Sequence, residues 1–295
     1  MISRFESNVG VDSMSKPLQR VAMRAPGAIL RADQQLWHYS APVDPEALNS
    51  QYQAFVQLVE DSGAEVLWMD DEDDDLADSV FTYDPSFVVP GGAVVLSPGK
   101  PLRAGEADLH RRFYDQNNIP ILGAISTPGT VEGGDCFWLD ESTLAVGRGF
   151  RTNQSGIEQL QAILEPRGIE VLAYDLPYYL GPEACLHLMS VVSSLDADLA
   201  LVYARLVPTA LYSKMLDMGY TLLHAPADEF ERSLGLNLNV LATSPRNVIA
   251  VDGFPKTAEL MRSSGCEVST FLADALCIPC EGGPTCLTRP ILRRA

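Results

Sequence analysis

Two segments of the chain carry the residue types that thiol chemistry requires. Cys286 follows Gly282 and Gly283 in the run CIPCEGGPTCLTRP, and glycines allow the backbone to approach a ligand closely. The thiolate is the reactive form of cysteine, so a nucleophilic Cys286 needs a base partner. His187, in ACLHLMSVVSS, is the candidate, although a histidine among apolar residues is by default a packed core residue. A catalytic role therefore requires a carboxylate that orients the imidazole.

The other cysteines and histidines indicate less. Cys277 and Cys280 have C-x-x-C spacing, but a structural zinc site needs four ligands and no second suitable pair exists. We therefore expect core or loop thiols and no metal. His110, in the polar segment EADLHRRF, is predicted to face solvent. His38 is placed in an N-terminal loop, and His224 at the end of a strand.

Carboxylates occur in two unusual settings. Glu132 and Asp135 flank two glycines in VEGGDCFWL, which predicts a turn that opens into a strand. Asp78 and Asp84 bracket the run DSVFTYDP; six residues apart, they would face one side of an extended segment. Alternatively, Asp84 is only a turn residue before Pro85. Two carboxylates on one buried face repel each other unless a cation lies between them, and a guanidinium suits that position.

The elements that must position these residues follow a repeated pattern. Five amphipathic segments each end in a Gly or Asn and lead directly into a β-type run. The pivots are Gly63, Asn118, Gly168, Gly219 and Gly265. Such a residue suits a helix C-terminus, where the chain adopts a left-handed conformation.

The first of these helices has the clearest signals. Asp44 is predicted to cap it, with Pro45 in the first turn and an apolar stripe formed by Leu48, Tyr52, Phe55 and Val59.

A second β-type run precedes each amphipathic segment: RVAMRAPG, GAVVLSPG, STLAVGRG, LALVYARL and NVIAVDG. The pattern predicts five strand–helix–strand modules of about 50 residues, a period typical of radial repetition. We favour five-fold radial closure because the copies are evenly spaced. An open, doubly wound α/β sheet is the alternative.

Composition narrows the class of protein. The chain has 295 residues, of which 46% are apolar, and a net charge of −18, so it is predicted to be globular and an unlikely partner for nucleic acid. No apolar run is long enough to cross a membrane, and no export signal is evident. The sparse cysteines are expected to be reduced in the cytoplasm. The acidic stretch 70–75 (DDEDDD) is interpreted as a solvated loop, and glycine-rich nucleotide loops are absent.

Five motifs, taken in order, resemble a known family. DSVFTYDP, VEGGD, GRGFRTN, CLHLMS and GGPTCLTRP resemble the dimethylarginine dimethylaminohydrolases of the amidinotransferase and arginine deiminase (pentein) superfamily. The resemblance implies an α/β fold, a five-bladed α/β propeller with the active site in a central channel. It covers a single catalytic domain at residues 21–295, preceded by an N-terminal extension at residues 1–20.

The resemblance also implies roles for individual residues. By position, Cys286 is similar to the family's nucleophile, His187 to its general acid and base, and Glu132 to the carboxylate that orients the histidine. The implied substrate-binding residues are Asp78 and Asp84 for the guanidinium, Arg103 and Arg151 for the α-carboxylate, Cys280 near the substrate backbone, and Tyr83. Tyr83 departs from the acidic residue usual at its position, which leaves the preferred N-substituent open.

The implied activity is hydrolysis of the guanidinium group of an N-methylated arginine to citrulline and methylated amine, through a covalent thiouronium and without cofactor. The partner would be a small guanidino substrate, not a nucleic acid or a membrane; homo-oligomer formation stays open. Related deiminases and amidinotransferases are alternatives. A non-enzymatic binding protein on the same fold, as in ribosome anti-association factors, is disfavoured by the cysteine, histidine and carboxylate set.

Overall fold

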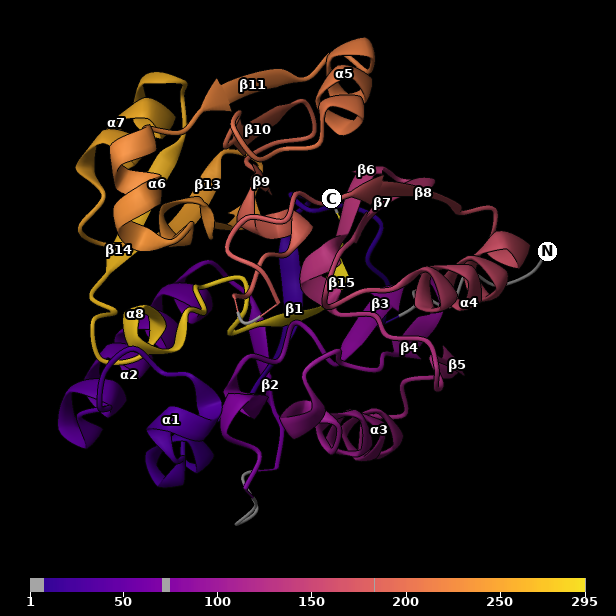
Figure 1. Cartoon of the computed structure of the whole chain (residues 1–295), viewed down its shortest axis with the longest axis horizontal. Helices are drawn as coiled ribbons and strands as arrows, with labels where there is room; N and C mark the ends of the chain where they lie inside the picture. The colour runs from indigo at the N-terminus through magenta and orange to yellow at the C-terminus, as the bar shows by residue number, and fades with distance from the viewer. Residues whose placement is uncertain (1–7, 71–74, 183, 295) are drawn as a thin grey trace.

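The computed structural model describes residues 8–70, 75–182 and 184–294, and within these ranges the strands form five three-stranded sheets (Figure 1). Every sheet has the same topology. A middle strand pairs antiparallel with one neighbour and parallel with the other. This repetition confirms five radial modules and excludes one open doubly wound sheet.

In each module a helix connects the two parallel strands, as the β-type runs and amphipathic segments predict. The middle strands are β1 (Leu18–Met23), β4 (Gly92–Val95), β7 (Thr143–Arg148), β10 (Leu199–Val202) and β13 (Asn247–Val251). The connecting helices are α2 (Pro45–Asp61), α3 (Glu106–Gln116), α4 (Gln154–Leu164), α5 (Thr209–Asp217) and α7 (Pro255–Ser263). The outer strands are β2 (Glu65–Trp68), β5 (Ile121–Ala124), β8 (Glu170–Asp175), β11 (Thr221–His224) and β14 (Glu267–Phe271).

All five predicted pivots have positive φ. The angles are +89° at Gly63, +53° at Asn118, +73° at Gly168, +89° at Gly219 and +86° at Gly265. Each pivot therefore takes the left-handed conformation that ends a helix and turns the chain into the outer strand.

Helix α2 shows why these segments fold as they do. The Asp44 carboxylate accepts hydrogen bonds from the backbone N–H groups of Glu46 and Ala47, and Pro45 occupies the first turn. The predicted apolar stripe is buried, with Val56 added to it.

Each sheet has a further strand on the other side of its middle strand, called its first strand below. Of the five first strands, the sequence predicted only the one that follows VEGGD. These first strands are β3 (Ser86–Val89), β6 (Cys136–Asp140), β9 (Val192–Ser194), β12 (Leu241–Ser244) and β15 (Arg289–Arg293). They are almost entirely buried, whereas the outer strands are partly exposed, so the first strands lie towards the centre of the molecule. β15 pairs with β1 and so completes the first module with the C-terminal end of the chain.

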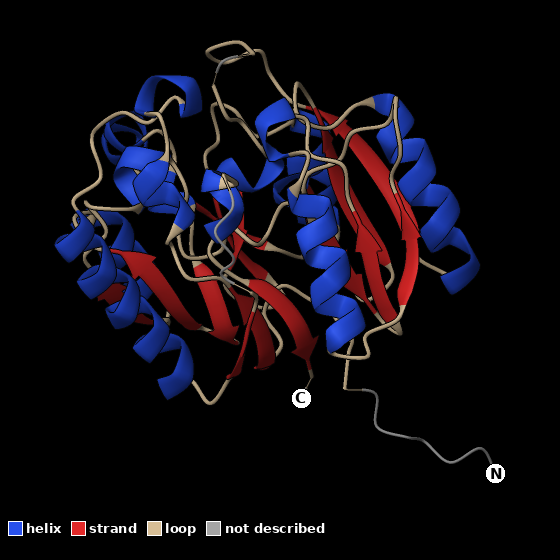
Figure 2. Cartoon of the chain, turned by 90° about the horizontal axis from the view of Figure 1, so that it is seen from below, coloured by secondary structure: helices blue, strands red, loops and turns tan. Residues whose placement is uncertain are grey.

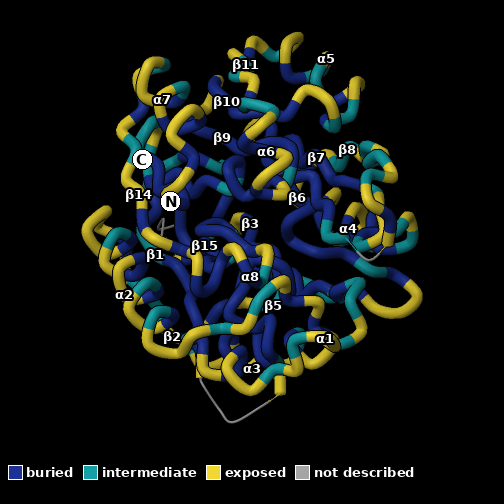
Figure 3. The backbone as a smooth tube through the Cα atoms, turned by 60° about the vertical axis from the view of Figure 1, so that its left-hand side comes forward, coloured by how far each residue is buried: buried dark blue, intermediate teal, exposed yellow. Residues whose placement is uncertain are grey.

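The long helices flank the strands in Figure 2, and exposed residues lie on the helices and loops at the periphery in Figure 3. There are three shorter helices. α1 (Gln34–Trp37) lies within the first module, between β1 and α2, whereas α6 (Ala227–Ser233) and α8 (Cys277–Cys280) lie between modules in the chain. No described helix has the length and apolar character that a membrane span requires.

Two local predictions differ from the structure. The run DSVFTYDP is not extended: a 3₁₀ helix (Ala77–Val80) begins it and a turn completes it. His110 does not face solvent but is fully buried, because the inner face of α3 includes Leu109, His110, Phe113 and Tyr114. Its Nδ1 contacts the Ser86 hydroxyl at 2.8 Å, and burial lowers the pKa of the imidazole.

The described part of the predicted N-terminal extension packs on the domain. Val9 and Val11 are buried, Gly10 donates a backbone hydrogen bond to Ile291, and β1 begins at Leu18. Residues 71–74, most of the predicted acidic loop, lie outside the described residues.

Candidate active site

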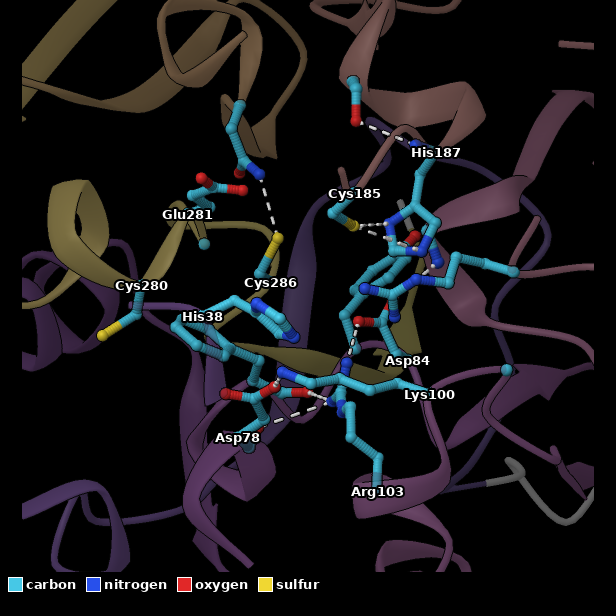
Figure 4. Close-up of a pocket in the computed structure, with 18 of the residues that line it drawn as sticks. His38, Asp78, Asp84, Lys100, Arg103, Cys185, His187, Cys280, Glu281 and Cys286 are labelled. Atoms are coloured by element: carbon cyan, nitrogen blue, oxygen red, sulfur yellow. Dashed lines mark hydrogen bonds and ion pairs between the residues drawn. The ribbon is translucent and has the colours of Figure 1, made fainter. Parts of the chain in front are cut away.

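A cavity of about 530 Å³ lies where the turns that enter the first strands meet (Figure 4). Asp84 precedes β3, His187 precedes β9 and Cys286 precedes β15, and all three line this cavity. Glu132, which precedes β6, lies behind His187. Residues separated by up to 200 positions in the sequence are thus brought together by equivalent turns of different modules.

His187 and Glu132 form a buried imidazole–carboxylate pair. Nε2 of His187 lies 2.6 Å from Oε2 of Glu132, and Glu132 is completely buried. Burial alone would raise the pKa of Glu132, but Arg151 and His187 outweigh it and hold the carboxyl well below its usual pKa. Burial would likewise lower the pKa of His187, but the charges of Cys185, Asp84 and Asp135 raise it. The pair therefore favours a carboxylate beside an imidazolium.

Cys286 presents a half-buried thiol to the same cavity. Burial raises its pKa to about 11 and the Asp84 carboxylate adds to the rise, whereas hydrogen bonds from Asn239 and the Gly283 backbone oppose it. The Asn239 side-chain amide donates to Sγ at 2.9 Å. Asn239 was not singled out in the sequence, where GLNLNVLA carries no recognisable chemical motif.

Glycines of two motifs are explained by close packing rather than by strained backbone. In VEGGD, a Cβ on Gly133 would lie 2.1 Å from the Tyr83 carbonyl oxygen, and one on Gly134 would lie 2.4 Å from Nδ1 of His187. Gly282 and Gly283 were expected to admit a ligand. Instead the ring of Phe81 lies against Gly282 and the side chain of Asn239 against Gly283.

The two aspartates both reach the cavity, but each already has partners. The Asp78 carboxylate accepts from the Tyr39 hydroxyl at 2.7 Å and from Nζ of Lys100 at 2.7 Å. Asp84 accepts from the Gly134 backbone N–H at 2.9 Å and from Arg103 at 2.6 Å. A carboxylate has about four acceptor positions, so both retain capacity for a ligand.

Arg103 has different surroundings from those that the resemblance implies. It is buried between Asp84 and Glu106, and its Nε and Nη2 groups donate to the Glu106 carboxylate at 2.8–3.1 Å. Nη2 also donates to the Phe81 carbonyl oxygen. Since this guanidinium is committed to internal acceptors, it is badly placed to bind a ligand carboxylate.

Arg151 is better placed to bind a carboxylate. It lines the cavity, and only its Nη1 donates to the described residues, to both oxygens of Glu132 at 3.0 and 3.1 Å. Its Nε and Nη2 groups have no partner among the described residues and could take an external anion.

Tyr83 and Cys280 also line the cavity. The Tyr83 ring stacks on the Arg289 guanidinium, 3.8 Å from the ring centroid, and its backbone N–H donates to the Cys286 carbonyl. Tyr83 thus stabilises the turn that carries Cys286. Cys280 ends α8, and Figure 4 shows its sulfur turned away from Cys286.

Two further residues of this cavity were missed from the sequence. Lys100 lies over the Trp37 ring, with its ammonium 4.7 Å from the ring centroid, and neutralises Asp78. Cys185 places its sulfur 3.7–3.8 Å from the two ring nitrogens of His187. Cys185 is the first residue of the motif CLHLMS, but nothing in the spacing distinguishes a side chain that enters the cavity.

Asp84, Glu132 and His187 have ligand atoms within 4.8 Å of one another and could in principle hold a metal ion. However, both Glu132 oxygens accept from Arg151, and one of them also from the Gly99 backbone N–H. A divalent cation there would lie against the Arg151 guanidinium, so the arrangement suits an acid–base pair better than a metal.

Comparison with known proteins shows to which family this chain belongs. The family model described as arginine deiminase matches residues 72–230. The N(G),N(G)-dimethylarginine dimethylaminohydrolase of Streptomyces coelicolor is 30% identical over 230 residues, covering 76% of this chain and 79% of the relative. The chain belongs to the pentein superfamily. Within it, an arginine deiminase of Listeria monocytogenes is 25% identical, covering 75% of this chain and 62% of the relative.

Solved pentein structures share the fold. A dimethylarginine dimethylaminohydrolase from Pseudomonas aeruginosa, complexed with citrulline, aligns with a TM-score of 0.72 at 22% identity, covering 92% of this chain and 99% of that chain. SxtG, an amidinotransferase from Microseira wollei, aligns with a TM-score of 0.79 at 18% identity, covering 98% of both chains. The chain is therefore a guanidine-modifying pentein, with dimethylargininases, deiminases and amidinotransferases at similar distances.

Proposed function

We propose that this pentein hydrolyses the guanidinium group of N-methylated arginine, a linear amidine, to citrulline and a methylated amine. The observation that carries the proposal is the meeting of Cys286, the His187–Glu132 pair and Asp84 in one cavity. A thiol, a protonated imidazole and a carboxylate are the three groups that thiol-dependent cleavage of a guanidinium needs. The dimethylarginine dimethylaminohydrolase of S. coelicolor supports the choice of substrate.

In the first half of the reaction, the Cys286 thiolate forms an S–C bond to the central carbon of the guanidinium. The positive charge of the substrate lowers the pKa of the neighbouring thiol, offsetting the effect of burial. The imidazolium of His187 donates its proton to the departing amine nitrogen as the C–N bond breaks. A covalent thiouronium remains on Cys286.

In the second half, neutral His187 removes a proton from water as the water oxygen bonds to the thiouronium carbon. The S–C bond then breaks and regenerates the thiolate, the remaining hydroxyl proton passes to solvent, and the neutral ureido product leaves. Glu132 stays ionised throughout, because Arg151 and His187 hold its pKa low. It fixes the orientation of the imidazole and stabilises the imidazolium.

Substrate binding is assigned to side chains that still have hydrogen-bond donors or acceptors available for a ligand. Asp84 would hold the guanidinium plane, and Asp78 would take it in exchange for the Lys100 ammonium. Arg151 would bind the α-carboxylate, a role that Arg103 is badly placed to share because its donors face Glu106 and Asp84.

The main alternative is a guanidine-modifying activity on unmethylated arginine, either deimination or amidino transfer. The match to the arginine deiminase family model and the similarity to Listeria arginine deiminases favour it. Transfer differs from hydrolysis only in whether an amine or water attacks the thiouronium.

A substrate panel tests the proposal. Purified protein is incubated with dimethylarginine, monomethylarginine, arginine or agmatine, and ureido product and released amine are measured. We expect the highest kcat/KM with a methylated arginine, and no product from the Cys286→Ser variant. A higher kcat/KM with arginine would establish the deiminase alternative, and ureido product from Cys286→Ser would exclude the thiol mechanism.

A further inference from the structure

Equivalent turns supply the reactive residues of four modules, and the fifth turn has no assigned role. Asp84, Glu132, His187 and Cys286 each stand two to five residues before the first strand of their own sheet. The turn before β12 holds Asn239, two residues before Leu241 and next to the 3₁₀ helix Leu236–Leu238. Its side chain lines the same cavity.

The contacts of Asn239 fix which end of its amide faces the nucleophile. Oδ1 accepts the backbone N–H of Thr285 at 3.0 Å. A backbone N–H can only donate, so the oxygen must face Thr285 and the NH₂ group must face Cys286. Nδ2 then donates to Sγ at 2.9 Å.

The surrounding chain holds this arrangement in place. The Asn239 amide lies so close to Gly283 that a Cβ there would be 2.4 Å from Cγ of Asn239. The Thr285 hydroxyl donates to the Val240 carbonyl at 2.9 Å. Thr285, next to Cys286, is therefore hydrogen-bonded to both Asn239 and Val240. The amide is therefore pre-positioned against sulfur in the resting protein.

We propose that Asn239 is the fifth member of the catalytic set: its amide stabilises the thiolate of Cys286 and aims the sulfur at the guanidinium carbon. A hydrogen-bond donor interacts more strongly with an anionic sulfur than with a neutral thiol. The inference rests on the proposed role of Cys286 as nucleophile. The same contact opposes the rise in the pKa of this thiol that burial causes.

The test measures the apparent pKa of the Cys286 thiol in the full-length protein. Iodoacetamide labelling is followed across pH 6–11, and the labelled peptide is quantified by mass spectrometry so that Cys185 is scored separately. In Asn239→Ala the pKa of Cys286 should rise by about one unit, with labelling near pH 8 slowed about tenfold. In the isosteric Asn239→Asp, a carboxylate facing the sulfur should raise the pKa further.

Asn237→Ala provides the control for a purely structural effect. Asn237 is buried in the same 3₁₀ helix and donates to the Thr257 hydroxyl instead. The Asn237→Ala substitution should lower the free energy of unfolding while leaving the pKa of Cys286 unchanged. The same pKa in wild type and both Asn239 variants would overturn the inference but leave Cys286 as the nucleophile. Full turnover after Cys286 is replaced would instead overturn the proposed function.

Discussion

Arg151 contacts Glu132 on one side and lines the cavity on the other, so its replacement should have two separable effects. Its Nη1 binds Glu132, which orients His187, while its remaining donors face the cavity. The first contact should matter for every substrate, because all of them need the acid–base pair. The second should matter only for substrates with an α-carboxylate.

The Arg151→Ala substitution should therefore raise KM more for substrates with an α-carboxylate than for a decarboxylated substrate such as agmatine. A charge-assisted hydrogen bond contributes about 1.5–3 kcal/mol, so KM for dimethylarginine should rise about 10- to 150-fold beyond any change seen with agmatine. Steady-state kinetics with both substrates measure the difference. Equal losses would show that Arg151 acts only through Glu132.

Lys100 competes with the substrate for Asp78 in the proposed binding mode. Lys100→Met keeps the stem over the Trp37 ring but removes the ammonium that lies 2.7 Å from Asp78. Agmatine should then bind roughly two- to tenfold more tightly, because its guanidinium need not displace a charge. Titration calorimetry on a Cys286→Ser background measures the affinity. Weaker agmatine binding would mean that Asp78 does not receive the guanidinium.

At the scale of elements, α3 is coupled to the aspartate turn through a buried carboxyl. Glu106, in the first turn of α3, is fully buried against Arg103, which also holds Asp84. Burial raises the pKa of Glu106 to about 7, although Arg103 opposes the rise. The folded protein therefore binds this proton more tightly than the unfolded chain does.

This linkage has a definite sign. The pKa of Glu106 is about 7 in the folded protein and near 4.5 in the unfolded chain. Protonated Glu106 therefore stabilises the fold fully below pH 4.5, and this stabilisation is lost as the pH rises through about 7. It amounts to about 3 kcal/mol at most. The free energy of unfolding of wild type should therefore fall between pH 5 and 8 relative to that of Glu106→Gln, which cannot titrate.

Urea unfolding at the two pH values measures the slope. Glu158→Gln, at an exposed position of α4, serves as the control and should parallel wild type. A Glu106→Gln slope equal to that of wild type would mean that Glu106 stays ionised in the folded protein.

The sequence predicted the elements whose signals are local. Helix α2 has its cap and stripe within one segment, and the pivots follow from the residue types that tolerate positive φ. The first strands other than β6 were missed because they are short and buried on both faces, which removes the alternation of apolar and polar residues.

Side-chain partners were harder to predict than elements. The burial of His110 depends on Ser86, and the pairing of Arg103 depends on which face of the next helix turns inward. The set of Cys286, His187 and Glu132 came from a resemblance to a family rather than from spacing. Asn239 escaped notice because its contact with Cys286 joins two modules.

At the scale of the molecule, the ring of modules is closed by β15. This strand pairs with β1, and Ile291 in it is fully buried in the core shared with β3, β4 and β6. Ile291→Ala should lower the free energy of unfolding by about 2–5 kcal/mol. Ile278→Ala, at a 43% exposed position of α8, should cost under about 0.5 kcal/mol. Urea unfolding checks both; equal small losses would show that closure contributes little.

Covalent catalysis by Cys286 is tested most directly by rapid quenching of the reaction. Protein is mixed with dimethylarginine or with arginine and quenched in acid within milliseconds to seconds. It is then digested, and the masses of its cysteine-containing peptides are measured by mass spectrometry. Since the amine leaves before the thiouronium is trapped, both substrates should add the same mass, and only to the Cys286 peptide. An adduct on Cys185 instead, or turnover with no adduct on Cys286 at any quench time, would contradict the account.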